Sequence, residues 1–146
     1  LNYKKMNTQK YPTWLVPLDI AKELKEIGFN EPCHFYYQND YSEYLKAGDP
    51  NKYHIISDSL AANRKNANHN NSDIAISAPS WEEALAWFRA KDYYGNLEAT
   101  SKGTSAYIFT PKLDFGDWEF AYKESYEEAR EALLLKLIDL YKTANQ

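Results

Sequence analysis

Residues 78–89 read Ala78-Pro79-Ser80-Trp81-Glu82-Glu83-Ala84-Leu85-Ala86-Trp87-Phe88-Arg89. Ser80 can accept a hydrogen bond from the backbone N–H of Glu83, and the Glu83 carboxylate can accept one from the N–H of Ser80, so a helix is expected to begin here. The large apolar side chains recur at helical spacing and share one stripe: Trp81, Ala84, Leu85 and Phe88, with Trp87 at its flank. Burying aromatic side chains of this size stabilises by roughly 2–3 kcal/mol each, which predicts a central helix in the core.

Two more helices and several strands are expected around this helix. Pro17 and Gly28 mark the ends of a first helix, and Ser125 can cap a long final helix at about 126–142. Aromatic and alternating runs predict strands at 33–37, 52–57, 93–99, 105–110 and 118–122, with a short bridge at 74–76. Because neighbouring strands are close in sequence, we expect an α+β fold, a single domain with about three helices packed on antiparallel β-hairpins.

The 146 residues fit one domain with one core. We interpret residues 1–10 as a flexible N-terminal tail and residues 11–146 as the domain. Met6, the only methionine, is a candidate for the natural start. Residues 61–73 are rich in asparagine and predict a surface loop, since they offer little to bury. Helix-then-hairpin order occurs twice, from Trp14 and from Trp81, which a duplication would explain but which also arises often by chance.

Charge and cysteine content restrict the function classes. The net charge of −4 comes from 21 acidic and 17 basic residues, which argues against a general nucleic-acid binder. The single cysteine, Cys33, excludes an internal disulfide and a cysteine-based zinc cluster. The chain has no long apolar run and no secretory signal pattern, so a cytoplasmic protein without a membrane span is expected.

No catalytic, cofactor-binding or metal-binding residue is predicted, and no cofactor is expected. The chain has neither a Gly-x-Ser-x-Gly nucleophile motif nor a glycine-rich phosphate loop. His34 and Cys33 are adjacent on a predicted strand and so point to opposite faces, which opposes a shared metal. The acidic pairs Glu82-Glu83 and Glu127-Glu128 open helices, where negative charge is stabilising.

The unusual feature of the composition is its 13 tyrosines and four tryptophans. One interpretation is that the tyrosines build the core and the strand faces. The other is a recognition surface, because tyrosine offers contact area at low entropic cost. The candidate interaction residues are Tyr36, Tyr37, Tyr41 and Tyr44 on the first hairpin, and Leu135, which faces away from the apolar stripe of the final helix.

Several short motifs occur in order along the chain: Trp14-Leu15-Val16-Pro17, Ile27-Gly28-Phe29-Asn30-Glu31-Pro32-Cys33, Ala78-Pro79-Ser80-Trp81, Trp87-Phe88-Arg89 and Tyr126-Glu127-Glu128-Ala129-Arg130-Glu131-Ala132. In these motifs the chain resembles a group of small uncharacterised proteins encoded in bacterial prophages and mobile elements. The resemblance covers most of residues 11–142 and implies a phage or mobile-element origin and an intracellular location. It implies no activity. The asparagine-rich residues 63–71 depart from the shorter connection expected there.

The resulting hypothesis is a non-enzymatic interaction or accessory protein whose partner is a protein. Two alternatives stay open. The first is a small enzyme whose acids and histidines converge only in three dimensions. The second is a nucleic-acid-binding module, because the final helix resembles that of a double-stranded-RNA-binding domain. That helix begins here with Glu127-Glu128, where such domains carry lysines that bind phosphate.

Overall fold

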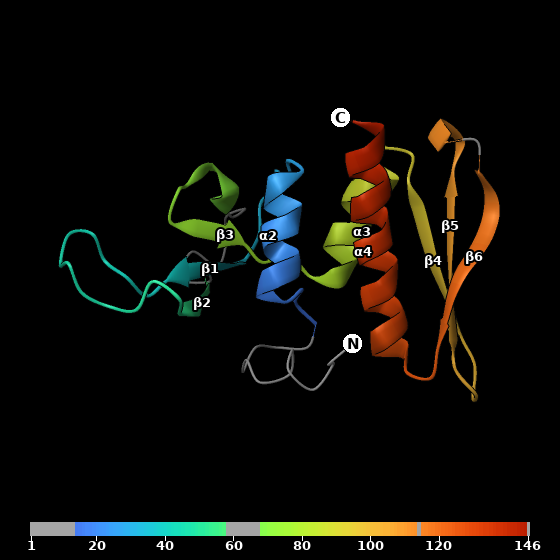
Figure 1. Ribbon diagram of the computed structural model, residues 1–146, viewed down its shortest axis with the longest axis horizontal. Helices are drawn as coiled ribbons and strands as arrows, with labels where there is room; N and C mark the ends of the chain where they lie inside the picture. The colour runs from blue at the N-terminus through green and yellow to red at the C-terminus, as the bar shows by residue number, and fades with distance from the viewer. Residues whose placement is uncertain (1–13, 58–67, 114, 146) are drawn as a thin grey trace. The chain divides into compact units, whose positions relative to one another are not determined.

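The computed structural model describes residues 14–57, 68–113 and 115–145 (Figure 1). These residues confirm the α+β class, with three α-helices and two three-stranded antiparallel sheets. Their order is α2 (Leu18–Glu26), β1 (Phe35–Asn39), β2 (Tyr53–Ser57), β3 (Ala75–Ser77), α3 (Trp81–Arg89), β4 (Tyr94–Ala99), β5 (Thr104–Thr110), β6 (Phe115–Lys123) and α4 (Tyr126–Ala144). Contacts group the described residues of the predicted domain into two compact units, an N-terminal unit within 14–80 and a C-terminal unit within 81–145.

The N-terminal unit contains α2 and the sheet with strand order β2-β1-β3. The expected short bridge before the central helix is strand β3, which pairs with β1 and makes β1 the middle strand. The central residue of β1, Tyr37, lies opposite Ile55 of β2 and Ile76 of β3. Helix α2 packs near β3, and the Nζ atom of Lys25 donates to the carbonyls of Ser72 (2.7 Å) and Ala75 (2.8 Å). These bonds tie α2 to the segment that enters β3.

The ends of α2 follow the predicted residues with small shifts. Pro17 is the N-cap, one position before the first helical residue, and Ile27 is the C-cap. Gly28 follows with a φ of +96°, a conformation that glycine adopts without the steric cost of a side chain. The apolar face of the helix is buried: Leu18, Ile20, Ala21 and Leu24.

The C-terminal unit contains α3, α4 and the sheet with strand order β4-β5-β6. Helix α4 packs along this sheet (Figure 1). A Cβ atom at Gly95 of β4 would lie 2.9 Å from Leu137 Cδ1 and 3.0 Å from Leu133 Cδ1, so glycine allows the helix to approach the strand closely. The predicted cap of α4 is confirmed, because Oγ of Ser125 accepts from the N–H of Glu128 at 3.1 Å.

An aromatic cluster forms the centre of the C-terminal unit. The ring of Phe88 lies 5.1 Å from Trp87, 6.4 Å from Tyr93 and 6.1 Å from Tyr141, measured between centroids. The predicted helical stripe needs one correction: Leu85 is only half-buried, whereas Trp87 is buried. Trp87 is buried because the ring of Tyr141 on α4 packs against it and against Phe88. Tyr93, just before β4, packs against Phe88 as well. Leu135 of α4 is exposed, as its position off the apolar stripe predicted.

The asparagine-rich segment is only partly described, since residues 61–67 lie outside the described residues, as does the predicted tail at 1–10. The described part is more structured than a surface loop requires. His69–Asn71 form a 3-10 helix whose N-cap is Asn68. The side chain of Asn70 donates to the carbonyl of Phe29 (2.9 Å) and accepts from the N–H of Ser77 (2.8 Å). This part of the asparagine-rich segment therefore connects distant parts of the N-terminal unit.

Candidate functional site

The connection from β1 to β2, residues 40–52, is called the 40–52 loop here. Its backbone folds back on itself between Ser42 and Ala47, which exchange two hydrogen bonds, Ser42 N–H to Ala47 O (2.7 Å) and Ala47 N–H to Ser42 O (3.3 Å). Oγ of Ser42 also accepts from the N–H of Leu45 at 3.1 Å. Two residues take positive φ, Lys46 at 49° and Gly48 at 104°, and these reverse the chain direction in a short space.

Asp40 holds the two ends of the 40–52 loop together. Its Oδ2 accepts from the N–H of Asp49 at 2.8 Å, and its Oδ1 lies 2.6 Å from Nε2 of His54 on β2. Its own N–H donates to the carbonyl of Lys52 at 2.7 Å. The Asp49 hydrogen bond, followed by that of His54, lowers the pKa of the Asp40 carboxyl below its ordinary value, because both bonds favour the charged form.

A second set of polar contacts closes the base of the loop. Nδ2 of Asn39 donates to the carbonyl of Pro50 at 2.7 Å, while its Oδ1 accepts from the N–H of Tyr41 at 2.9 Å. Oδ1 of Asp49 accepts from the N–H of Asn51 at 2.8 Å. Such side-chain-to-backbone bonds substitute for the ladder of a sheet and specify a turn conformation. The loop is therefore held by its own polar residues.

The tip of this loop presents large apolar side chains to solvent. Tyr44 is 94% exposed and Leu45 is 69% exposed, while Tyr41 at the base is 36% exposed. Single exposed apolar residues are ordinary on protein surfaces. Here two adjacent ones lie at the end of a loop whose backbone is held by hydrogen bonds.

The predicted interaction residues are not brought together as one surface. Tyr37 was predicted to be an interaction residue at the surface, and this prediction is wrong. Its side chain is 2% exposed, and its hydroxyl donates a hydrogen bond to the carbonyl of Val16 at 2.7 Å. Tyr37 points to the face of β1 on which Ile55 and Ile76 are its cross-strand neighbours and on which its hydroxyl reaches the buried Val16. Tyr36, on the other face of the strand, is half-buried and stacks on His69 with ring centroids 4.1 Å apart.

Leu135 belongs to the C-terminal unit and Tyr44 to the N-terminal unit, so the two are separate candidates. The sequence interpretation missed Leu45 and Ile74, whose side chains are largely exposed. Leu45 directly follows Tyr44 in the sequence, and that adjacency was the available signal. Ile74 gave no such signal, because its alternation with Ile76 pointed to a strand.

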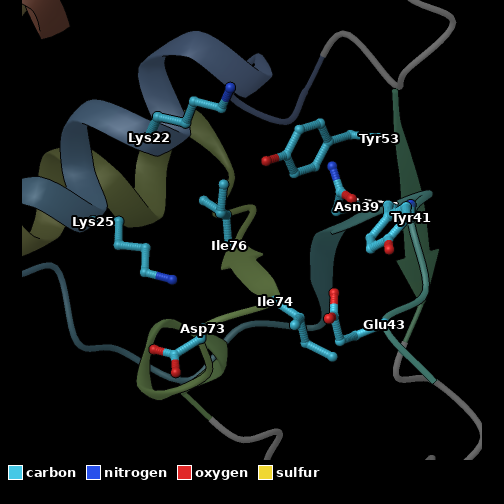
Figure 2. A pocket seen from close by; sticks show the side chains of 9 residues that line it. All are labelled: Lys22, Lys25, Asn39, Tyr41, Glu43, Tyr53, Asp73, Ile74 and Ile76. Atoms are coloured by element: carbon cyan, nitrogen blue, oxygen red, sulfur yellow. Dashed lines mark hydrogen bonds between the residues drawn. The ribbon is translucent and has the colours of Figure 1, made fainter. Parts of the chain in front are cut away.

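A pocket of about 310 Å³ lies in the N-terminal unit (Figure 2). Its lining comes from α2, β1, the 40–52 loop, β2, the segment leading into β3 and β3 itself: Lys22, Lys25, Asn39, Tyr41, Glu43, Tyr53, Asp73, Ile74 and Ile76. Nζ of Lys22 lies 4.8 Å from the ring centroid of Tyr53, a cation–π distance. Two side chains of the loop, Tyr41 and Glu43, thus also form part of the pocket wall.

The histidines and the cysteine are not part of a cluster of metal ligands in the described part of the chain. Cys33 is buried with its Sγ 3.5 Å from the carbonyl of Glu31, while the neighbouring His34 is exposed. Across residues 14–57, 68–113 and 115–145, no three His, Cys, Asp or Glu side chains are grouped as metal ligands. The same ranges contain no helix with the length and apolar character needed to cross a membrane.

Comparison with known proteins adds no family to this description. The chain matches no protein-family model, and neither a curated protein nor a solved structure shows significant similarity to it.

Proposed function

We propose that this chain is a non-enzymatic interaction protein that binds a protein partner through the tip of the 40–52 loop. The carrying observation is that Tyr44 and Leu45 are highly exposed on a loop whose backbone is held by polar side chains. The proposal includes an accessory role in a phage or mobile element and a cytoplasmic location. Those two parts rest on the ordered sequence motifs, and a gene neighbourhood without phage genes would oppose them.

The energetics of association support a preformed loop as the contact. Ordering a flexible loop on binding costs free energy, and a loop already held in place avoids that cost. Tyrosine is enriched among the residues that dominate binding energy, and leucine at its side adds apolar area. The Ser42–Ala47 backbone pair and the Asp40–Asp49 bond provide the required order here.

The charges around the tip favour a protein over a nucleic acid. Glu43 and Asp49 lie on the same loop as Lys46, so the tip carries no excess of positive charge. Nucleic-acid affinity normally comes from several lysines and arginines that neutralise phosphates. An apolar tip with mixed charges matches instead the composition of a protein interface, with an apolar centre and a polar rim.

The test is quantitative capture from the native cell with the full chain and with the double variant Tyr44→Ser and Leu45→Ser. The control is Tyr122→Ser with Leu135→Ser, which removes a tyrosine and a leucine of the C-terminal unit that are also exposed. We expect the loop variant to lose at least tenfold of the retained partner and the control to retain it.

Both variants should keep the stability of the original chain within about 0.5 kcal/mol, as is usual for surface substitutions. Equal capture by the original chain and the loop variant would refute the loop as the interface. Loss of capture in the control variant alone would move the interface to the C-terminal unit, where Leu135 is the remaining candidate.

A further inference from the structure

The pocket of the N-terminal unit brings charges of both signs to one small space. Lys22 and Lys25 project from α2, and Glu43 reaches the pocket from the opposite side, while Asp73 lies at its lower end in the view of Figure 2. In that view of Figure 2 the ammonium of Lys22 lies toward the upper end and that of Lys25 lies lower on the same side, with the Asp73 carboxylate below Lys25 and the Glu43 carboxylate on the opposite side. The net charge of this lining is zero, but its charges are separated in space.

These four charged groups make no ion pair with one another or with other residues in the described ranges. Lys25 uses two of its three N–H groups on the carbonyls of Ser72 and Ala75. Because a lysine ammonium carries three donors, one is left. Lys22 lies over the Tyr53 ring, which leaves its charge without a carboxylate partner. The pocket can accept a ligand charge at each end without breaking an existing ion pair.

The surface between the charges is largely apolar. Ile76 is buried and Ile74 is exposed, and both line the pocket together with the rings of Tyr41 and Tyr53. A volume of about 310 Å³ is at the small end of the range of about 300–1,000 Å³ that is usual for small-molecule sites. The occupant should therefore be small, with a short apolar segment between its charged groups.

We propose that this pocket binds a small zwitterionic amino carboxylate. The ligand carboxylate accepts from Lys22, and the ligand ammonium donates to Glu43 on the opposite side of the pocket. The aliphatic segment lies against Ile74 and Ile76. A ligand with only one charge would form only one of these ion pairs, so it should bind more weakly than a zwitterion.

This binding does not depend on the proposed protein partner, although Tyr41 and Glu43 connect the pocket to the 40–52 loop. The test is calorimetric titration of the full chain with a series of zwitterions of increasing length: glycine, γ-aminobutyrate and ε-aminocaproate. The singly charged controls are hexanoate and hexylamine. We expect at least one zwitterion to bind tenfold or more tightly than either control.

Variants then locate the binding. Lys22→Gln and Glu43→Gln should each weaken the zwitterion at least tenfold. The matched controls Lys52→Gln and Glu31→Gln remove equal charges of the same unit that do not line the pocket, and should bind like the original chain. Amide chemical-shift changes in the unmutated protein provide a second measurement, and should concentrate at Tyr53, Ile74 and Ile76.

The proposal is overturned if no zwitterion binds more tightly than hexanoate and hexylamine. It is also overturned if a zwitterion binds but the Lys22→Gln and Glu43→Gln variants match their controls, or if the shift changes fall outside the pocket.

Discussion

Both units contain buried and exposed aromatic side chains, but only the C-terminal unit gathers four aromatic rings into one cluster among the described residues. In the C-terminal unit Trp87, Phe88, Tyr93 and Tyr141 gather in one cluster between α3, α4 and the start of β4. In the N-terminal unit Tyr44 is exposed at a loop tip, and Tyr41 and Tyr53 line a pocket. Each unit has a three-stranded antiparallel sheet, but the C-terminal unit has two helices, α3 and α4, and the cluster joins them, whereas the N-terminal unit has α2 alone among the described residues. The buried cluster is expected to carry much of the stability of the C-terminal unit, whereas the recognition sites that we propose, the loop tip and the pocket, lie in the N-terminal unit.

The connections within the two hairpins also differ, in their length and in how they are held. The turn from β4 to β5 is short, and Thr100 and Gly103 close it, with Oγ1 of Thr100 donating to the carbonyl of Gly103 at 2.8 Å. The 40–52 loop is much longer and needs Asn39, Asp40 and Ser42 to hold it. A long connection costs more entropy to order than a tight turn does. Hydrogen bonds from these side chains offset that cost here and hold the loop in one conformation.

The largest expected effect comes from removing an aromatic ring of the C-terminal cluster. Phe88→Ala should lower the free energy of unfolding by about 3–5 kcal/mol, because the ring is fully buried and the cavity left behind cannot collapse completely. Urea unfolding followed by tryptophan fluorescence measures it. A loss below about 1 kcal/mol would show that this cluster does not carry the stability of its unit.

A smaller effect is expected at Gly48 in the 40–52 loop. Gly48→Ala should destabilise by about 1–3 kcal/mol, because its φ is +104° and a new Cβ would overlap the backbone carbonyl of Asp40. Gly28→Ala is the matched control, since φ there is +96° with nothing within 4 Å of the new Cβ. Unfolding measured by amide exchange of β1 and β2 should show a larger loss at Gly48 than at Gly28. Equal losses would mean that the loop can move away from Asp40 at no cost.

Tyr37 of the N-terminal unit and Tyr93 of the C-terminal unit are both buried, so their substitution by phenylalanine compares a bonded hydroxyl with one that is unbonded within the described ranges. Tyr37→Phe should cost about 1–2 kcal/mol, because the buried carbonyl of Val16 loses its 2.7 Å hydrogen bond. The Tyr93 hydroxyl is also buried but has no hydrogen-bond partner among the described residues. Tyr93→Phe should therefore leave the stability unchanged or raise it by less than about 1 kcal/mol. Thermal unfolding of both variants checks this contrast, and equal losses would contradict it.

Burial, together with the nearby Tyr141, raises the pKa of Tyr93 above its ordinary value. The stability contribution of this group has a defined sign. Because the pKa is raised in the folded state, the stability that the neutral phenol contributes is fully present below the ordinary tyrosine pKa of about 10, and it is lost as the pH rises through the raised pKa of the folded state. Spectrophotometric titration should place Tyr93 among the last tyrosines to ionise.

The smallest expected effect is the pH dependence of the 40–52 loop. The pKa of Asp40 is lowered by the N–H of Asp49 and by His54, so its stabilising contribution is fully present above the ordinary carboxyl pKa. It is lost as the pH falls through the lowered pKa of the folded state. Amide exchange at Asp49 should speed up in that acidic range, and Asp40→Asn should remove this pH dependence. A variant with the same acid response as the original chain would refute the assignment to Asp40.

Much of the fold was predictable because its signals are local. The Ser125 cap, the Gly28 helix end and the alternating aromatic strands each depend on residues a few positions apart. The pairing of β3 with β1 was not predictable in the same way, since it joins segments far apart in the sequence. Nor was the contact between Tyr37 and Val16, which lies on the buried face of β1. A tyrosine on a middle strand and a tyrosine on a loop look alike in a sequence.

The candidate site was predictable only in part, for a related reason. Tyr41 and Tyr44 were named from their density in the sequence, and both are exposed. The pocket could not be named, because Lys22, Glu43 and Asp73 meet only after α2, the loop and the segment before β3 have folded together. The bonds of Asp40 to Asp49 and His54 likewise need the hairpin register first.

The claim that most needs testing is that the 40–52 loop is ordered before it binds anything. Native-state hydrogen exchange of the free full chain measures this directly at the amides of Ser42, Ala47 and Asp49, whose hydrogen bonds hold the loop. We predict exchange at least tenfold slower at these three amides than in an unstructured peptide of the same sequence. Exchange at the peptide rate would contradict a preformed loop and would remove the main support for the proposed function.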